Sequence, residues 1–299
     1  MPRFRLVHIS DPHLPPPTGA LRGRDVASKR LLSAIAWRRK RAEHQPAVLE
    51  ALIADVRAHA PDHVALTGDL TNFATPAEVA AARAWLQALG DPSHVTVSPG
   101  NHDALVGARD HARFAPWREW LGDDAEIAFP AVRERGPLAL INLCSATPTA
   151  PWLATGRLGG DQLDRLAATL EALRRRDLFR VLMLHHPPTA GIVSGRKALV
   201  DAEPLRAIIA AHGVDLVLHG HAHEAAISAL PGPDGPIPVL GTPSASAVGA
   251  GRHPPARWHA IEFGPDPADR GLRITARGLS KATGRFEPLG GYRLATAQR

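Results

Sequence analysis

The stretch Ser98-Pro99-Gly100-Asn101-His102-Asp103 places an amide, an imidazole and a carboxylate in a row after a short apolar run. These side chains are poorly suited to a buried strand, but they suit the rim of a metal and phosphate site. Taken alone, the stretch is more typical of an ordinary turn, since Asn, Gly and Asp are common turn residues. A functional interpretation therefore depends on whether other stretches of the same design occur in the chain.

Four further stretches have this design, and each follows an apolar run that predicts a strand. They are Asp11-Pro12-His13, Gly68-Asp69, His185-His186 and Gly220-His221-Ala222-His223. In open α/β sheets, ligands bind at the carboxyl ends of the strands, so we expect the five stretches to converge on one edge. Together they offer eight candidate side chains: Asp11, His13, Asp69, Asn101, His102, His185, His221 and His223.

These eight side chains carry hard or borderline nitrogen and oxygen donors, and none of them is a thiolate. Two divalent ions about 3.5–4 Å apart need a bridging carboxylate and several terminal ligands each, and this set meets that need. The donors suit Mn, Fe, Co or Zn better than Ca, and they exclude a soft metal site. We therefore predict two divalent metal ions without choosing among these elements.

The elements that must position these side chains are strands alternating with helices. We expect strands at 4–9, 64–67, 94–97, 138–143, 179–184 and 214–218, and helices at 25–42, 46–59, 76–89, 161–176 and 204–212. Thr75 and Glu78 form a capping-box pattern at the start of the third helix. Strands at 224–230, 237–241, 257–263, 272–278 and 290–295 end the chain. This order predicts an α/β fold with a sheet buried on both faces, in one domain over 1–299.

The composition is that of a globular chain with a large core, since 44% of its 299 residues are hydrophobic and 21% are charged. The single cysteine, Cys144, cannot form an internal disulfide and indicates neither an oxidising compartment nor a thiolate zinc site. We find no segment typical of a signal peptide and no run near the roughly 20 apolar residues of a membrane span. We therefore expect a cytoplasmic protein.

The net charge of +6 is concentrated in residues 22–43, which hold eight basic residues against two acidic ones. The remainder of the chain is neutral, so we expect no general nucleic-acid binding, which depends on excess positive charge. A local basic element is expected instead.

Five motifs follow one another along the chain: Asp-X-His at 11–13, Gly-Asp at 68–69, Gly-Asn-His-Asp at 100–103, a His after a strand at 185, and Gly-His-X-His at 220–223. Their types and their order resemble those of the calcineurin-like metallophosphoesterase family. Each motif is weak alone, whereas the ordered set is specific and spans about three quarters of the chain. The resemblance implies a four-layer αββα sandwich of two mixed β-sheets flanked by helices, with residues 224–299 completing the second sheet.

The resemblance also implies a role for each matching residue. The metal ligands would be Asp11, His13 and His223 at the first metal, Asn101, His185 and His221 at the second, and Asp69 between the two. A hydroxide bridging the cations, with its pKa lowered by both, would attack phosphorus in line. His102 would lie over the substrate and donate a hydrogen bond or a proton toward the leaving oxygen.

Three neighbouring residues are candidates for supporting roles. Asn72 matches a family position that is often acidic or an amide, and it is a candidate to orient His102. Asp103 is a candidate to support the ligands from behind. His186 is the alternative to its neighbour as a metal ligand. The histidines outside the motifs, His44 and His253 among them, are expected to be surface or structural residues.

The basic segment 22–43 is an insertion relative to the minimal family pattern. One interpretation is a solvated helix face. The other is a lid or anchor for an anionic substrate group, or for an anionic lipid surface, since Leu31, Leu32, Ile35 and Trp37 supply an apolar side.

The function that this pattern favours is a metal-dependent phosphodiesterase acting on a small phosphodiester or diphosphate. His-His-Pro-Pro and Gly-His-X-His resemble the bacterial cyclic-nucleotide and glycerophosphodiester phosphodiesterases more than the Ser/Thr protein phosphatases. A pyrophosphatase acting on a nucleotide-linked or lipid-linked diphosphate is the alternative enzyme. A non-catalytic scaffold on the same fold is the third candidate, but such proteins lose ligands, and this chain retains all seven.

Overall fold

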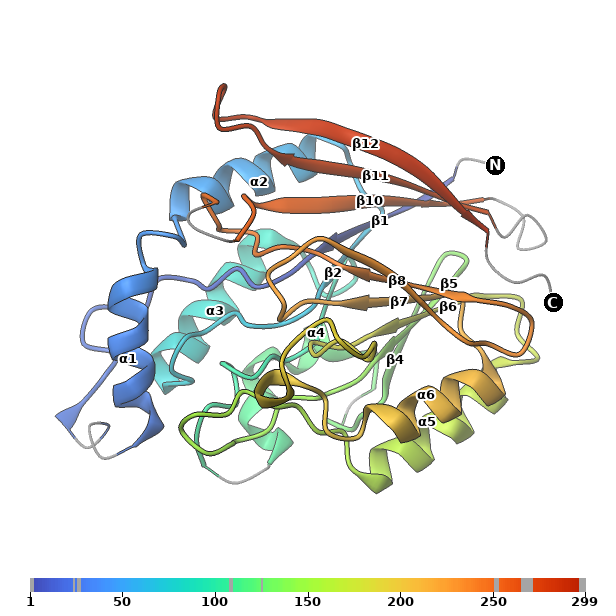
Figure 1. Cartoon of the computed structure of the whole chain (residues 1–299), viewed down its shortest axis with the longest axis horizontal. Helices are drawn as coiled ribbons and strands as arrows, with labels where there is room; N and C mark the ends of the chain where they lie inside the picture. Colours follow the sequence, from blue (N-terminus) through green and yellow to red (C-terminus); the bar gives the residue numbers. More distant parts are fainter. Residues whose placement is uncertain are drawn as a thin grey trace.

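Two six-stranded β-sheets form the middle of the molecule (Figure 1). The computed structural model describes residues 3–23, 25, 28–107, 110–124, 126–249, 253–264 and 271–295. The first sheet has the order β12-β11-β10-β1-β2-β3, and the second has the order β4-β5-β6-β7-β9-β8. The strands of the first sheet are β1 (Phe4–Ile9), β2 (His63–Leu66), β3 (Val95–Val97), β10 (Arg257–Phe263), β11 (Gly271–Leu279) and β12 (Phe286–Ala295). Those of the second are β4 (Ala131–Arg135), β5 (Leu138–Asn142), β6 (Phe179–Met183), β7 (Leu216–His219), β8 (Ala226–Leu230) and β9 (Ile237–Gly241).

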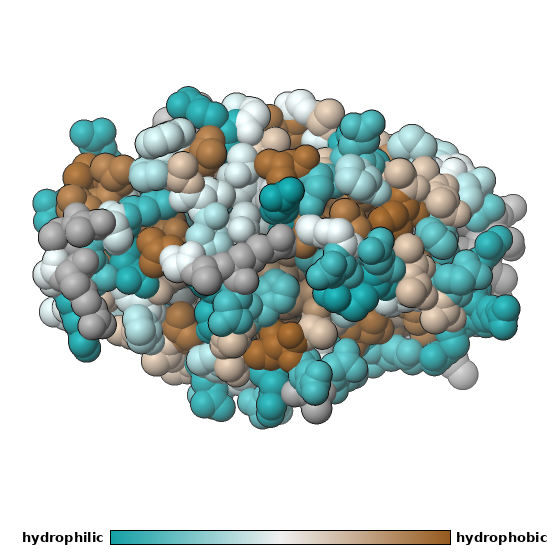
Figure 2. Space-filling view, turned by 90° about the horizontal axis from the view of Figure 1, so that it is seen from below, coloured by the Kyte–Doolittle hydropathy of each residue, from teal (hydrophilic) through white to brown (hydrophobic). Residues whose placement is uncertain are grey.

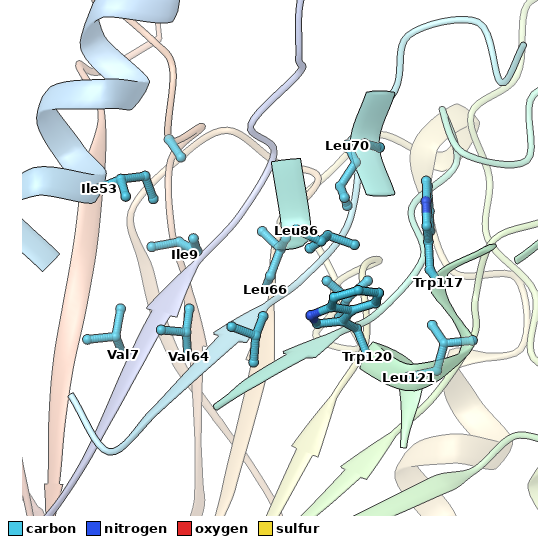
Figure 3. Close-up of a cluster of buried hydrophobic side chains, with 14 of the residues drawn as sticks. Val7, Ile9, Ile53, Val64, Leu66, Leu70, Leu86, Trp117, Trp120 and Leu121 are labelled. Carbon is cyan, nitrogen blue, oxygen red and sulfur yellow. The ribbon is translucent and has the colours of Figure 1, made fainter. Parts of the chain in front are cut away.

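Alternation of side chains along the strands creates three layers of core. In β1, Leu6 packs in the core between the two sheets, where Phe179 and Phe263 also meet, with ring centroids 5.0 Å apart. Val7 and Ile9 point the other way, into the core beneath the helices, because successive side chains leave opposite faces of a strand. Figure 3 shows Val7 and Ile9 on this side, in the cluster that also holds Trp117 and Trp120.

Helices cover the outer face of each sheet. The first sheet is covered by α2 (Pro46–Ala58), α3 (Pro76–Leu89), a 3-10 turn (His111–Trp117) and α4 (Arg118–Leu121). The second is covered by α5 (Gly160–Leu173) and α6 (Ala202–His212), which lie side by side (Figure 1). The remaining helices are α1 (Lys29–Lys40) and a 3-10 turn at Gly195–Lys197. The fold is therefore the predicted four-layer αββα sandwich.

Local signals set the boundaries of α3 as predicted, whereas α5 ends at Leu173 instead of 176 and α6 begins at Ala202 instead of 204. Thr75 caps α3 by accepting from the backbone N–H of Glu78, the Glu78 carboxylate accepts from the backbone N–H of Thr75, and Gly90 ends the helix. The apolar stripe of α2 buries Leu49, Leu52, Ile53 and Val56 against the first sheet, while Val48 is only partly buried.

Two expectations about the elements need correction. Residues 224–299 do not all complete the second sheet: β8 and β9 join it, whereas β10, β11 and β12 extend the first sheet through antiparallel pairing with β1. The expected helix at 25–42 is shorter, running from Lys29 to Lys40, and residues 24, 26 and 27 lie outside the described residues.

The parallel strands point their carboxyl ends toward one edge of the sandwich. β1, β2 and β3 are parallel to one another, and so are β5, β6, β7 and β9. Within the described part of the chain, we find no helix that is both long and apolar enough to cross a bilayer.

Candidate functional site

All seven predicted ligands lie at the edge where these parallel strands end. They follow β1, β2 and β3 of the first sheet and β6 and β7 of the second. The structure groups them into two sets that share the carboxylate of Asp69. One set also contains Asp11, His13 and His223, and the other also contains Asn101, His185 and His221.

One donor cluster is centred on the Nε2 atom of His185, which is fully buried. This nitrogen lies 3.3 Å from Asp69 Oδ2, 3.2 Å from Asn101 Oδ1 and 3.2 Å from His221 Nδ1. Four potential ligand atoms from four different loops therefore meet at one point. We call these four residues the Asn101 cluster.

Backbone carbonyl groups determine which nitrogen each imidazole of the Asn101 cluster presents. His185 Nδ1 donates to the carbonyl of Thr67 at 2.7 Å, and His221 Nε2 donates to the carbonyl of Lys197 at 3.0 Å. The opposite nitrogen of each ring is then left with a lone pair that points at the carboxylate and the amide oxygen. Such partners on a metal-binding histidine fix its tautomer and orientation.

The lone pairs of the Asn101 cluster repel one another unless a positive charge lies between them. Burial acts to lower the pKa of His185, but Asp69 and Asp11 outweigh burial and raise it to about 9. Burial acts to raise the pKa of Asp69, but His185 and His102 hold it well below its ordinary value. The cluster thus favours a cation at its centre, which is the property of a metal site.

The second donor cluster lies on the other side of Asp69 and consists of Asp11, His13, His223 and the shared Asp69. His223 Nε2 is 3.3 Å from both Asp11 Oδ1 and His13 Nε2, and His13 Nε2 is 3.9 Å from Asp69 Oδ2. The Asp11 Oδ1 atom is buried and has no hydrogen-bond donor. A buried carboxylate oxygen facing imidazole nitrogens again fits a cation. We call this set the Asp11 cluster.

Asn72 contacts two histidines: its side chain holds His13, a candidate ligand of the Asp11 cluster, and its backbone carbonyl holds His102, the residue for which we proposed it. Its Oδ1 accepts from His13 Nδ1 at 3.1 Å, and its Nδ2 donates to the carbonyl of Leu14 at 2.7 Å, which fixes the amide. The backbone carbonyl of Asn72 accepts from His102 Nδ1 at 2.9 Å.

The loops after the strands adopt a backbone conformation that is uncommon for residues with side chains. Five of the seven predicted ligands have φ between 43° and 66°: Asp11, His13, Asp69, His221 and His223. Such left-handed residues turn the chain sharply and cluster at functional sites. Three backbone bonds join the first two loops: the N–H groups of Asp11, His13 and Leu14 donate to the carbonyls of Gly68, Asp69 and Leu70, respectively.

Two glycines allow the ligand loops to pack against one another. A Cβ on Gly100 would overlap the Asp69 carboxylate, and a Cβ on Gly220 would overlap the side chains of Ser10 and Asp11. The glycines of the Gly-Asn-His-Asp and Gly-His-X-His motifs are therefore needed for close approach.

His102 and Asp103 occupy different sides of the motif that contains them. His102 is partly exposed, and its backbone N–H donates to Asp69 Oδ1 at 2.8 Å. Asp103 is buried behind the ligands and accepts from the backbone N–H groups of Gly100 and Thr71 at 2.9 and 2.8 Å. Burial, with the nearby Asp69 charge, raises the pKa of Asp103 to about 7. Asp103 thus shapes the ligand loop instead of facing the site.

The family model for calcineurin-like phosphoesterases matches residues 4–225 of this chain. The chain belongs to this family. A relative named "Probable cyclic nucleotide phosphodiesterase" from Synechococcus sp. is 32% identical over 219 residues, which are 72% of this chain and 77% of the relative. This phosphoesterase is therefore a metal-dependent phosphohydrolase.

Solved structures share the fold of the phosphoesterase at low sequence identity. A dimetal phosphatase from Danio rerio matches with a TM-score of 0.58 and 12% identity, covering 99% of this chain and 100% of that one. A purple acid phosphatase from yellow lupin matches with a TM-score of 0.61 and 13% identity over 98% of this chain. The phosphoesterase spans about half of the lupin protein, since 54% of that chain is covered.

His186, the alternative ligand, has both ring nitrogens bound elsewhere. Its Nδ1 contacts Ser145 Oγ at 2.8 Å and its Nε2 contacts the carbonyl of Ala154 at 3.3 Å. Its ring packs on that of His221, with centroids 4.3 Å apart. His186 therefore supports the Asn101 cluster from behind, and the geometry favours His185 as the ligand.

A cavity of about 200 Å³ adjoins both clusters of the phosphoesterase, and α1 forms one of its walls. The α1 residues that line it are Ser33, Ala36, Trp37 and Lys40. Trp37 therefore does not belong to the outward apolar side on which we had placed it. The basic segment does reach the site, through Lys40, while Arg24 lies outside the described residues.

His44 lies at the site although no motif predicted it. It is buried beside the Asp11 cluster, with its ring 4.5 Å from that of His13 and stacked on Trp37 at 5.8 Å. Ser246 Oγ lies 3.0 Å from its Nδ1, and Ser244 donates to the carbonyl of Asp11 at 2.6 Å. One available signal was that both serines follow β9, a further parallel strand ending at the same edge. His253 also lines the cavity.

Proposed function

We propose that this phosphoesterase is a phosphodiesterase that holds two divalent cations, one in each donor cluster. The observation that carries the proposal is the position of Asp69, whose Oδ2 lies 3.3 Å from His185 Nε2 and 3.9 Å from His13 Nε2. One carboxylate facing two imidazole clusters is the arrangement that a two-metal phosphoryl-transfer site requires. The nitrogen and oxygen donors suit Mn, Fe, Co or Zn.

The ligands would divide between the cations as the two clusters do. Asp11, His13 and His223 would hold the first, Asn101, His185 and His221 would hold the second, and Asp69 would serve both. When bound, the cations would activate water and neutralise the negative charge on the phosphoryl oxygens.

His102 would act on the leaving group. Its Nδ1 donates to the carbonyl of Asn72, so Nε2 is the nitrogen available to the cavity that His102 lines. A proton held at Nε2 would be donated to the oxygen that leaves phosphorus, which is a general-acid role. The contact from its backbone N–H to Asp69 keeps the ring next to the reacting centre.

The size of the cavity and the name of the Synechococcus relative support a small phosphodiester substrate, such as a cyclic nucleotide. The α1 wall favours one alternative, a pyrophosphatase for a nucleotide-linked or lipid-linked diphosphate, because Lys40 offers a cation and Trp37 an aromatic surface to the non-reacting part. A cytoplasmic location remains a prediction from the sequence.

The test is turnover by protein stripped with chelator and reloaded with Mn²⁺, Co²⁺, Fe²⁺ or Zn²⁺. We expect hydrolysis of bis(p-nitrophenyl) phosphate and of 3′,5′-cyclic AMP, with slower hydrolysis of p-nitrophenyl phosphate and ADP-ribose. Asp69→Asn should lower kcat by about 10³-fold or more, because neither cluster keeps its shared carboxylate. Asp164→Asn, an exposed acid on α5, is the matched control and should keep full activity.

Two outcomes would overturn the proposal. Undiminished turnover by Asp69→Asn would exclude the two-cluster mechanism. Faster hydrolysis of ADP-ribose than of any diester would replace the phosphodiesterase with the pyrophosphatase.

A further inference from the structure

The helix α1 exposes its aliphatic side chains to solvent. Its cavity side carries Ser33, Ala36, Lys40 and one aromatic residue, Trp37, and the helix has no buried residue. Its large aliphatic side chains are exposed instead: Leu31 is 40% exposed, Leu32 is 51% exposed and Ile35 is 43% exposed. A surface helix normally turns its apolar stripe toward the core, whereas the described residues leave about half of this stripe exposed.

The exposed stripe is held in place, because the base of α1 is anchored at several points. Arg30 donates to Asp25 Oδ1 and to the carbonyls of Phe73 and Ala74, at 2.8 to 2.9 Å. Lys29 Nζ donates to Thr149 Oγ1 and to the carbonyl of Leu153, both at 2.7 Å. The apolar side chains therefore sit on a docked helix.

A second exposed apolar group lies at the same end of the molecule. Trp152 is 71% exposed, and it lies between the two residues to which Lys29 is bonded. Figure 2 shows brown, apolar atoms beside teal, polar ones at the end of the molecule where Figure 1 places α1. Tryptophan is the residue that proteins favour at the boundary between lipid and water.

Charge indicates which partner covers this face. The run Arg38, Arg39, Lys40 and Arg41 is exposed, and the sequence has no acidic residue from position 26 to position 42. On the helix, Arg38 and Arg39 lie three and four positions after Ile35, so they flank the apolar stripe. A second copy of the chain would bring two basic runs together, whereas an anionic lipid surface attracts both the charge and the apolar side chains.

We propose that the outer face of α1, defined by Leu31, Leu32, Ile35, Arg38 and Arg39 with the neighbouring Trp152, docks on the surface of an anionic phospholipid bilayer. The apolar side chains insert among the lipid head groups, and the arginines contact lipid phosphates. Because the inner face of the same helix lines the cavity, the site is then held within about one helix diameter, roughly 10 Å, of the membrane surface.

The experiment is co-sedimentation of the full chain with vesicles of phosphatidylcholine, with and without phosphatidylglycerol. We expect binding to the anionic vesicles that weakens with added salt. Leu31→Ser/Leu32→Ser/Ile35→Ser and Arg38→Gln/Arg39→Gln should each lower the partition coefficient by about tenfold or more. Matched controls at other exposed positions, Ile227→Ser and Arg174→Gln/Arg175→Gln, should bind as the unaltered chain does.

Two further measurements keep the proposal falsifiable. Tryptophan emission should shift to shorter wavelength on anionic vesicles, and Trp152→Phe should abolish the shift, while thermal unfolding shows that each variant is folded. Equal binding to both vesicle types, or retention by the folded triple serine variant, would overturn the proposal. A stable dimer in analytical ultracentrifugation that the triple variant dissociates would overturn it as well, by making this face a self-interface.

Discussion

At the scale of single residues, the site depends on how each histidine is held. Three of the candidate imidazole ligands give one N–H to an oxygen of the protein and keep one lone pair for the site. For His185 and His221 the acceptor is a backbone carbonyl, so no substitution can remove it. For His13 the acceptor is the side chain of Asn72, which makes this contact open to mutation.

Asn72→Ala should weaken the Asp11 cluster selectively. Loss of the amide oxygen frees the His13 ring, and removal of such an outer partner typically lowers metal affinity by about 10–100-fold. Titration calorimetry with Mn²⁺ should show one weakened site and one unchanged site. Asn72→Asp, which retains an acceptor for His13 Nδ1, should restore most of the affinity. Two unchanged sites in Asn72→Ala would contradict the assigned role.

His102→Gln should lower kcat without releasing metal, because the imidazole is adjacent to the clusters and is not one of the donor atoms that meet in them. General-acid catalysis contributes about 10²–10⁴-fold, so we expect a loss in this range for cyclic AMP, whose leaving oxygen needs a proton. The loss should be smaller for bis(p-nitrophenyl) phosphate, whose leaving group needs little help. Equal losses on both substrates would show that His102 acts on binding instead.

The sequence could predict the seven clustered side chains because each belongs to a motif that ends a strand. It could not predict His44, which follows α1 and is held at the site by contacts with a distant segment, including an isolated β-bridge between residues 44 and 247. It also could not show that Asn72 serves two histidines, since its side-chain oxygen accepts from His13 and its backbone oxygen accepts from His102. Both features depend on contacts between segments that are distant in the sequence.

At the scale of elements, the start of α3 holds part of the site in place. The Glu78 carboxylate is buried and accepts from the backbone N–H groups of Asn72, Phe73 and Thr75 at 2.9 to 3.2 Å. The capping box thus serves two purposes, because it starts the helix and it also fixes the loop that carries Asn72.

Glu78→Ala should therefore destabilise the fold by about 2–4 kcal/mol, since several buried N–H groups lose their acceptor. Urea unfolding followed by circular dichroism would measure the change. Glu78→Gln keeps one acceptor oxygen and should cost less. A change below about 0.5 kcal/mol in Glu78→Ala would mean that water replaces the carboxylate.

Helices and strands with a regular hydrophobic pattern were predictable from the sequence. A strand that buries a charged side chain was not. β4 (Ala131–Arg135) escaped prediction because its sequence, Ala-Val-Arg-Glu-Arg, looks like a solvated segment. In the structure Arg133 is buried, and its guanidinium donates to the carbonyls of Val95 and Gly122 and to Asp123. The terminal strands were predicted as strands, but strand periodicity does not reveal which sheet they join, because their pairing partner, β1, is distant in sequence.

At the scale of the whole molecule, buried neutral histidines link stability to pH. His63 lies in β2 with its Nε2 2.8 Å from Thr96 Oγ1, and burial, aided by Arg133 and Arg135, lowers its pKa to about 3. In the unfolded chain this pKa is near 6.5, so between about pH 3 and 6.5 the unfolded state binds the extra proton. The contribution of His63 is fully present above that range and is lost as the pH falls through it.

Unfolding free energies measured in urea from pH 7 to pH 4 should therefore fall with decreasing pH, and His63 should account for about 1.4 kcal/mol per pH unit below pH 6. His63→Asn should reduce the slope by that amount even if it lowers stability at pH 7. His259→Asn should act similarly, since burial also lowers the pKa of His259, to about 4. An unchanged slope in both variants would show that other groups control the acid response.

The donor clusters draw on both sheets: Asp11, His13, Asp69 and Asn101 follow strands of the first, while His185, His221 and His223 follow strands of the second. Neither half can present a complete set before the two layers have packed face to face in the right register. Cation binding during refolding would thus report the packing of the two sheets against each other. The protein with bound cations would also resist separation of the sheets, because the cations bind only the packed state.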